Sequence, residues 1–177
     1  YNLPATVIPL REDFSLNAED YCGLHQNIVI ANPNAPTGMT IPVSDIETLV
    51  QTNPDHVVLI DEAYVDFGAE SCRGLIGQYE NLLVCQTFSK AWSMAGGRLG
   101  FALGSAGLIA DLNKIKYSTN PYNINRLTLV AAEAAVDSDA YYRENCQKIQ
   151  DNRAYTVEEL AKLGFTTLPS LANFIFT

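Results

Sequence analysis

The sequence predicts an α/β fold in which a mostly parallel sheet is flanked by helices. Two observations favour this fold. Short apolar runs, of the length of buried strands, alternate with stretches whose apolar residues recur at helical spacing, as they do in βαβ units. In addition, a polar cluster follows each of the first three apolar runs. Such clusters are typical of strands that end at a binding edge of a sheet.

Four apolar runs are the predicted strands. They are residues 27–31 (NIVIA), 57–60 (VVLI), 82–86 (LLVCQ) and 99–103 (LGFAL). The second and third are almost continuously apolar, which is expected where helices cover both faces of a sheet.

The stretch SDIETLVQT predicts the first helix. Ser44 is its expected N-cap, and Glu47, three residues later, completes a capping box. Helical spacing directs three apolar side chains to the core: Ile46, Leu49 and Val50.

The second half of the chain is predominantly helical in pattern. Helices are predicted over residues 106–116, 124–136 and 140–163, and Gly164 is the expected C-cap of the last. This long helix would connect two domains.

We predict part of a large domain in residues 1–145, and a connecting helix with the start of a small α+β domain in residues 146–177. The final stretch, FTTLPSLANFIFT, predicts two short strands. The chain opens on Tyr1 rather than methionine and stops inside a predicted strand, so we expect a fragment of a longer protein.

Composition and charge exclude several classes of function. The net charge is −9 and the basic residues are scattered, which argues against a nucleic-acid surface. No apolar run is long enough to span a bilayer, so we expect a cytoplasmic protein. The four cysteines have no metal-ligand spacing, and we expect neither a metal site nor disulfides.

The polar clusters are NPNAPTG (32–38), DEAY (61–64) and TFSK (87–90). Each has an ordinary explanation when taken alone: a turn, a solvated helix start and a surface lysine. Since the carboxyl ends of parallel strands lie at one edge of a sheet, we expect all three clusters to converge there.

These residue types match the needs of pyridoxal phosphate. The cofactor requires a lysine amine for a Schiff base, a carboxylate beside its pyridine nitrogen, and groups that bind its phosphate. Lys90 is the predicted Schiff-base lysine, and its released amine would then move a proton on the substrate. Asp61 would keep the pyridine nitrogen protonated, and Tyr64 would reach the phenolic oxygen of the ring.

The predicted phosphate ligands are Thr87, Ser89 and Arg98. Two hydroxyl groups and a planar guanidinium suit phosphate oxygens. The glycine pair before Arg98 permits the tight turn that brings it back to the site.

With these motifs the sequence resembles the fold-type I pyridoxal-phosphate aminotransferases, and within them the histidinol-phosphate aminotransferases. NPNAPTG, DEAYVDF, TFSKAWSMAGGRLG, NPYNIN and SLANFIF follow the order of that family. The resemblance implies a large cofactor-binding domain and the same roles for Lys90, Asp61, Tyr64 and the phosphate ligands. It also implies a homodimer that acts in histidine biosynthesis, with glutamate and 2-oxoglutarate as the amino donor pair.

The sequence departs from the family pattern at two positions. Ala35 stands where the family has an asparagine that touches the cofactor ring, and the neighbouring Asn34 is the candidate to replace it. Gly97 stands where the family has a bulky apolar residue. The resemblance also implies a phosphate turn upstream of Tyr1 and a carboxylate-binding arginine downstream of Thr177.

Other functions compatible with the same residues remain open. One is another aminotransferase or decarboxylase of this branch, acting on an aromatic amino acid or phosphothreonine. The other is a non-catalytic effector domain of a transcription regulator, built on the aminotransferase fold.

Overall fold

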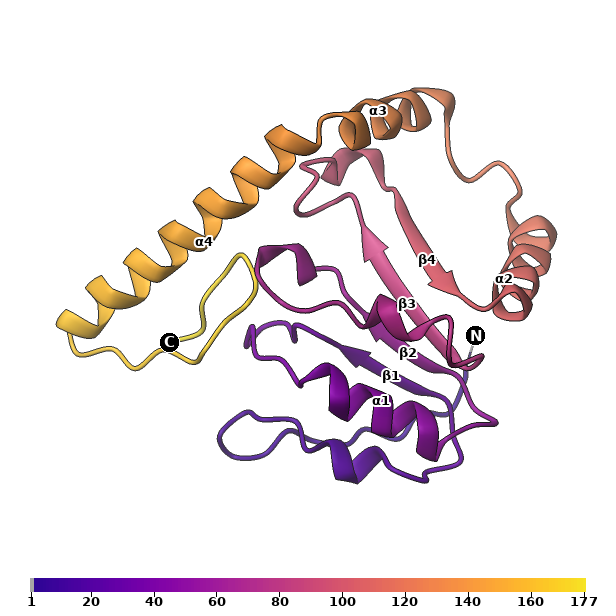
Figure 1. Ribbon diagram of the computed structural model, residues 1–177, viewed down its shortest axis with the longest axis horizontal. Helices are drawn as coiled ribbons and strands as arrows, with labels where there is room; N and C mark the ends of the chain where they lie inside the picture. The colour runs from indigo at the N-terminus through magenta and orange to yellow at the C-terminus, as the bar shows by residue number, and fades with distance from the viewer. Residues whose placement is uncertain (1) are drawn as a thin grey trace.

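The strands lie where the sequence predicts them. The computed structural model describes residues 2–177, so the first residue of the predicted domain 1–145 lies outside the described residues. Within that range the strands form a single sheet in the order β1-β2-β3-β4 (Figure 1). Their bounds are β1 Ile28–Ala31, β2 Val58–Asp61, β3 Leu82–Thr87 and β4 Gly100–Gly104. The first three are parallel and β4 is antiparallel to β3, which confirms the mostly parallel sheet.

Helix α1 (Val43–Thr52) covers one face of this sheet, but its predicted capping box is wrong. The helix begins at Val43 with Pro42 as its N-cap, and no side chain caps it. Proline, with its φ fixed at a value compatible with helix entry, is the N-cap two residues before the predicted one, so Ser44 lies inside the helix. Glu47 accepts a hydrogen bond from the Tyr79 hydroxyl instead (2.6 Å).

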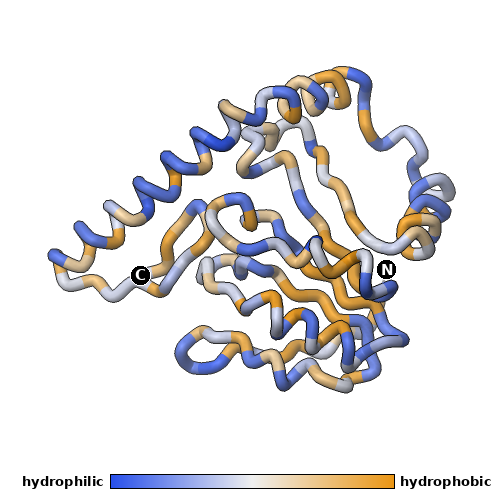
Figure 2. The backbone as a smooth tube through the Cα atoms, in the orientation of Figure 1, coloured by the Kyte–Doolittle hydropathy of each residue, from blue (hydrophilic) through white to orange (hydrophobic). Residues whose placement is uncertain are grey.

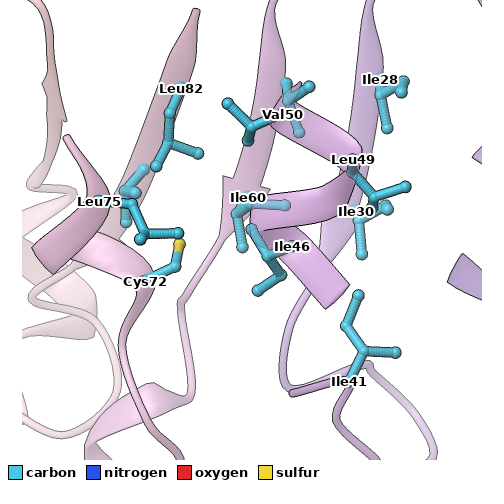
Figure 3. Close-up of a cluster of buried hydrophobic side chains, with 12 residues drawn as sticks. Ile28, Ile30, Ile41, Ile46, Leu49, Val50, Ile60, Cys72, Leu75 and Leu82 are labelled. Carbon is cyan, nitrogen blue, oxygen red and sulfur yellow. The ribbon is translucent and has the colours of Figure 1, made fainter. Parts of the chain in front are cut away.

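The main hydrophobic core lies between α1, the sheet and a short 3-10 helix, η3 (Cys72–Leu75) (Figure 3). Its α1 residues are the three predicted from helical spacing: Ile46, Leu49 and Val50. On the opposite face Val29 is 71% exposed. Among residues 2–177, helices therefore cover one face of β1 and leave the other open.

Three helices follow β4: α2 (Ala106–Thr119), α3 (Arg126–Asp137) and α4 (Asp139–Lys162). The long helix α4 is mostly hydrophilic (Figure 2). Its C-cap is Leu163, one residue before the predicted Gly164. Gly164 follows with a φ of +88°, and the next amide, Phe165 N, donates to Leu160 O (3.1 Å), so a left-handed glycine does end the helix.

Helix α4 docks on the loops that follow β2 and β3. A second hydrophobic cluster joins Phe67, Ala91 and Cys146. Beside it the rings of Trp92 and Tyr142 stack with their centroids 3.9 Å apart. Residues 2–177 also contain three further 3-10 helices: η1 (Ala18–Tyr21), η2 (Val65–Phe67) and η4 (Ala95–Gly97).

The prediction of two strands in FTTLPSLANFIFT is wrong for this structure. Residues 165–177 form no strand, although Leu168 N donates to Phe176 O (2.9 Å). No described strand lies beside this segment to supply a hydrogen-bond ladder. It turns back from the end of α4 toward the loops above β1 and β2 (Figure 1). Among residues 2–177, no helix is both long and apolar enough to cross a membrane.

Candidate active site

The open face of the sheet carries the first predicted site residues. Ala31, Asp61 and Cys85 are register partners across β1, β2 and β3. Side chains two positions apart on a strand share a face, so Thr87 lies on the same face as Cys85. The proximity of Asp61 and Cys85 has an electrostatic effect: burial raises the pKa of Cys85, and the Asp61 charge raises it further.

Two successive carboxylates, Asp61 and Glu62, point to opposite sides of the sheet. Asp61 is exposed, and its Oδ1 accepts a hydrogen bond from Ala63 N (3.0 Å). Glu62 is 1% exposed and accepts three hydrogen bonds. The donors are Ser71 Oγ (2.6 Å), Cys72 N (2.7 Å) and Gln86 Nε2 (2.8 Å). Asp61 is thus available to a ligand, whereas Glu62 is committed to the fold.

The structure brings Lys90 and Tyr64 together. Lys90 follows β3, and its Nζ lies 5.1 Å from the centroid of the Tyr64 ring. At this distance an ammonium group is attracted to the face of the ring by about 0.5–1 kcal/mol when exposed. Lys90 is exposed and Tyr64 is half-buried, so the amine lies at the surface of the edge where β2 and β3 end.

Thr87 shapes the turn that carries Lys90. Its hydroxyl donates to Leu99 O (3.3 Å) and accepts from Ser89 N (3.1 Å). This pair of hydrogen bonds fixes the backbone between β3 and the lysine. Ser89 is half-buried in the same turn.

Arg98 ends the glycine turn in a left-handed conformation. Its φ is +50°, which is uncommon for a residue other than glycine. Its Nη1 lies 3.4 Å from Ala95 O, and the Thr128 hydroxyl at the start of α3 donates to Gly97 O (3.3 Å). A Cβ at Gly97 would meet only ordinary van der Waals contacts, the nearest being Met94 Cε at 3.4 Å. The turn therefore has room for the first side-chain carbon of another residue at this position.

Asn34 lies in the loop after β1. Its carbonyl accepts from Gly38 N and its amide donates to Met39 O, both at 2.8 Å. These contacts use the backbone, and the role of its side chain toward a cofactor stays a prediction.

Sequence reasoning missed several residues that build this edge. Asn32 is buried and forms two hydrogen bonds with the backbone of Ile41, which closes the NPNAPTG loop. Glu62 could have been found, since a residue next to an exposed strand end faces the core by alternation. Phe174, whose ring packs against Tyr64, gave no signal because the two residues lie far apart in the sequence.

Comparison with known proteins then identifies the family of the chain. The model of the family described as aminotransferase class I and II matches residues 3–177. The chain belongs to this family. Two curated aminotransferases illustrate the likeness. The histidinol-phosphate aminotransferase of Marinomonas sp. (strain MWYL1) is 50% identical over 177 residues, which cover 99% of this chain and 50% of that protein. The histidinol-phosphate aminotransferase of Acinetobacter baumannii (strain AYE) is 51% identical over 169 residues, covering 96% and 47%.

A solved aminotransferase shares the fold. The crystal structure of histidinol-phosphate aminotransferase from Sinorhizobium meliloti, in complex with pyridoxal-5'-phosphate, matches with a TM-score of 0.84 at 27% identity. The match covers 96% of this chain and 48% of that one. The chain therefore spans about half the length of the aminotransferases that it matches.

Proposed function

We propose that this chain forms part of a pyridoxal-phosphate-dependent enzyme that transaminates histidinol phosphate with 2-oxoglutarate in histidine biosynthesis. One observation carries the proposal. Lys90 Nζ lies over the Tyr64 ring at the edge where the exposed Asp61 ends β2. The identity of about half the residues with curated histidinol-phosphate aminotransferases supports the choice of substrate.

The residues at this edge fit the cofactor by their chemistry. An amine, an exposed carboxylate and a phenol gather at the ends of β2 and β3, and they complement an aldehyde, a pyridine nitrogen and a ring oxygen. Thr87, Ser89 and Arg98 follow on the next turns of the chain and would supply hydroxyl and guanidinium donors to the phosphate. Asn34 is the candidate for a further contact with the ring.

Each of these residues then has a chemical task. Pyridoxal phosphate, when bound, supplies a conjugated ring that withdraws electrons from the α-carbon of an amino acid. The ionised Asp61 would hold a proton on the ring nitrogen, which sustains that withdrawal. Lys90 would hold the cofactor covalently and, once released, carry a proton on Nζ between substrate and ring. Tyr64 would donate its hydroxyl to the ring oxygen.

We further propose that the enzyme is a cytoplasmic homodimer that binds small amino and 2-oxo acids and no nucleic acid or membrane. The net charge of −9 supports the exclusion of nucleic acid. Helix α3 supports the dimer, because Leu127 is 83% exposed and Val130, one turn later on the same side, is 56% exposed.

Borohydride trapping tests the central assignment. The protein encoded by the complete gene is incubated with pyridoxal phosphate, reduced and mapped by mass spectrometry. We expect one reduced adduct, on Lys90. Lys90→Ala should abolish it and lower the thermal midpoint of the cofactor-free protein by no more than a few degrees, whereas Lys116→Ala, which removes another lysine near a tyrosine ring, should leave it intact. An adduct on another residue, or none, contradicts the proposal.

Substrate competition tests the reaction. We expect a higher kcat/KM for histidinol phosphate than for phenylalanine with 2-oxoglutarate as acceptor, and no carbon dioxide release from phosphothreonine. Equal or better turnover of phenylalanine would favour an aromatic aminotransferase, and decarboxylation would favour a phosphothreonine decarboxylase. Cofactor binding without turnover of any of them would favour a regulatory effector domain.

A further inference from the structure

The C-terminal residues 168–176, here called the strap, pack against the loops that build the proposed cofactor edge. One contact is with the NPNAPTG loop. Leu171 N donates to Gly38 O (2.9 Å), and a Cβ built at Gly38 would lie 2.1 Å from Ser170 Oγ. No side chain fits at Gly38 while the strap is in place, so the two segments meet backbone to backbone.

A second contact fixes the strap to the loop after β2. The Arg153 guanidinium, from α4, donates to Phe67 O (2.9 Å) at the end of η2 and to Ala172 O of the strap. Arg153 is half-buried between them, and burial lowers its pKa. One side chain of the long helix therefore holds together the strap and the loop that carries Tyr64.

The third contact reaches Tyr64 itself. Phe174 of the strap meets the Tyr64 ring edge to face, with centroids 5.0 Å apart and planes at 84°. The same ring lies beneath Lys90 Nζ at 5.1 Å. Tyr64 is thus bounded by the proposed Schiff-base lysine and by an aromatic residue distant in the sequence. An edge-to-face pair contributes about 0.5–1.5 kcal/mol beyond the area that it buries.

We propose that Phe174 is a positioning residue that fixes the orientation of the Tyr64 ring, and that Arg153 holds the strap in the place where Phe174 can do so. The proposal rests on the proposed function only for its consequence at the cofactor. Without Phe174 the Tyr64 ring loses its lateral support and samples other rotamers. Its hydroxyl is then no longer aimed in one direction, and the face beneath Lys90 is no longer fixed.

The experiment is fluorine NMR of the protein encoded by the complete gene, with fluorotyrosine incorporated. The resonance that disappears in Tyr64→Phe is assigned to Tyr64. In the protein without cofactor, we expect Phe174→Leu to shift and broaden the Tyr64 fluorine resonance. With pyridoxal phosphate as the probe, we expect the dissociation constant to rise about two- to tenfold. This range is the free energy of one aromatic pair expressed as a ratio of dissociation constants. Phe174→Tyr, which retains the ring, should restore both.

The strap offers a matched control in Phe176. Its ring packs on Phe14 with centroids 5.2 Å apart, away from Tyr64. Phe176→Leu should lower the thermal midpoint much as Phe174→Leu does but leave the Tyr64 resonance and the dissociation constant unchanged. Equal effects of the two substitutions on these readouts would mean a structural role only, and would overturn the proposal. So would an unchanged Tyr64 resonance in Phe174→Leu.

A second substitution keeps the test decisive if Phe174→Leu does not fold. Arg153→Met removes both hydrogen bonds, which Nη1 alone donates, and should move the Tyr64 resonance in the same direction, while Phe174→Tyr leaves it in place. An unmoved resonance in Arg153→Met would then contradict the proposal. If the wild-type protein binds no pyridoxal phosphate at Lys90, the proposed function fails, yet the resonance of the cofactor-free protein still decides whether Phe174 positions Tyr64.

Discussion

At the scale of single residues, Glu62 shows how a carboxylate can serve the site without touching a ligand. Its three hydrogen-bond donors come from the segment that leads into η3 and from β3. Because β3 continues from Gln86 into Thr87 and the Lys90 turn, the hydrogen bond from the Gln86 side chain to Glu62 links the end of β2 to the strand that leads to Lys90. Charge-assisted hydrogen bonds to a buried acceptor are among the stronger ones in proteins.

We expect Glu62→Gln to lower the free energy of unfolding by about 2 kcal/mol or more, because the amide offers one acceptor oxygen to three donors and leaves buried groups unpaired. Urea denaturation measures the loss. Glu70→Gln, at an exposed position on the same loop, is the control and should change stability little. Equal stabilities of the two variants would contradict this role for Glu62.

Substitution of Asp61, in contrast to that of Glu62, should affect catalysis and not stability. Since its side chain is exposed, Asp61→Asn should leave the unfolding midpoint unchanged. Loss of the negative charge at the ring nitrogen should lower kcat by about 10²-fold, the scale seen when one preorganised electrostatic contact is removed. Steady-state kinetics checks the loss. Asp55→Asn, an exposed carboxylate before β2, is the matched control, and an equal effect there would refute the role of Asp61.

At the scale of elements, the sequence predicted what depends on local pattern. The four strands and the core face of α1 follow from apolar spacing, which burial in a sheet or against it imposes directly. The start of α1 was missed because the helix begins after Pro42, two residues before the predicted N-cap Ser44. The predicted strands in the last residues depend on a pairing partner, which no local pattern contains. Tyr64 and Phe174 meet only through the tertiary fold.

The contact between the strap and the NPNAPTG loop gives a prediction at this scale. Gly38→Ala should destabilise the fold by about 1–3 kcal/mol, because the added methyl group overlaps Ser170 and the φ of +76° strains any residue with a Cβ. Calorimetry measures the loss. Ser170→Gly should cost less stability in the Gly38→Ala background than in the parent, because there it also removes the overlapping atoms along with the two hydrogen bonds of the Ser170 hydroxyl.

Gly107→Ala is the control for this pair. Gly107 lies at the start of α2, where a Cβ has space, and alanine favours helix by about 1 kcal/mol. It should stabilise the protein slightly. A Gly38→Ala variant as stable as the parent would mean that the strap does not lie in close contact with this loop.

At the scale of the whole molecule, stability should depend on pH through Asp66. Burial raises the pKa of Asp66, although a hydrogen bond from Tyr142 of α4 lowers it in part. The folded protein then holds a proton on Asp66 at pH values where the unfolded chain, with the usual pKa of 3.8, has lost it. The contribution of Asp66 is therefore most favourable below that value and is lost as pH rises through the higher pKa of the folded state.

We expect Asp66→Asn to remove this dependence. The unfolding free energy of the variant, relative to wild type, should rise as pH increases from the acid range, because only the wild type must then bury a charge. Denaturation curves across this pH range measure the difference. For Asp137→Asn, exposed at the end of α3, the free energy of unfolding should differ from that of wild type by the same amount at all pH values. A constant difference for Asp66→Asn would contradict the assignment.

The proposed dimer also belongs to this scale. Replacing Leu127 and Val130 with aspartate should shift the protein encoded by the complete gene from dimer to monomer at micromolar concentration, since charges would then face an apolar interface. Sedimentation velocity measures the shift. Glu133→Gln on the same helix should leave the dimer intact. A charged variant that remains dimeric would place the interface elsewhere.

The adjacent carboxylates at the end of β2 have one more consequence, for strand pairing during folding. If β2 slid by one residue against β1 and β3, every side chain would change face. Asp61 would then enter the core without the donors that Glu62 finds, and Glu62 would leave them unmatched on the outside. A buried carboxylate without partners costs several kcal/mol. The two carboxylates thus disfavour a one-residue shift in the register of β2, the strand that ends at Asp61.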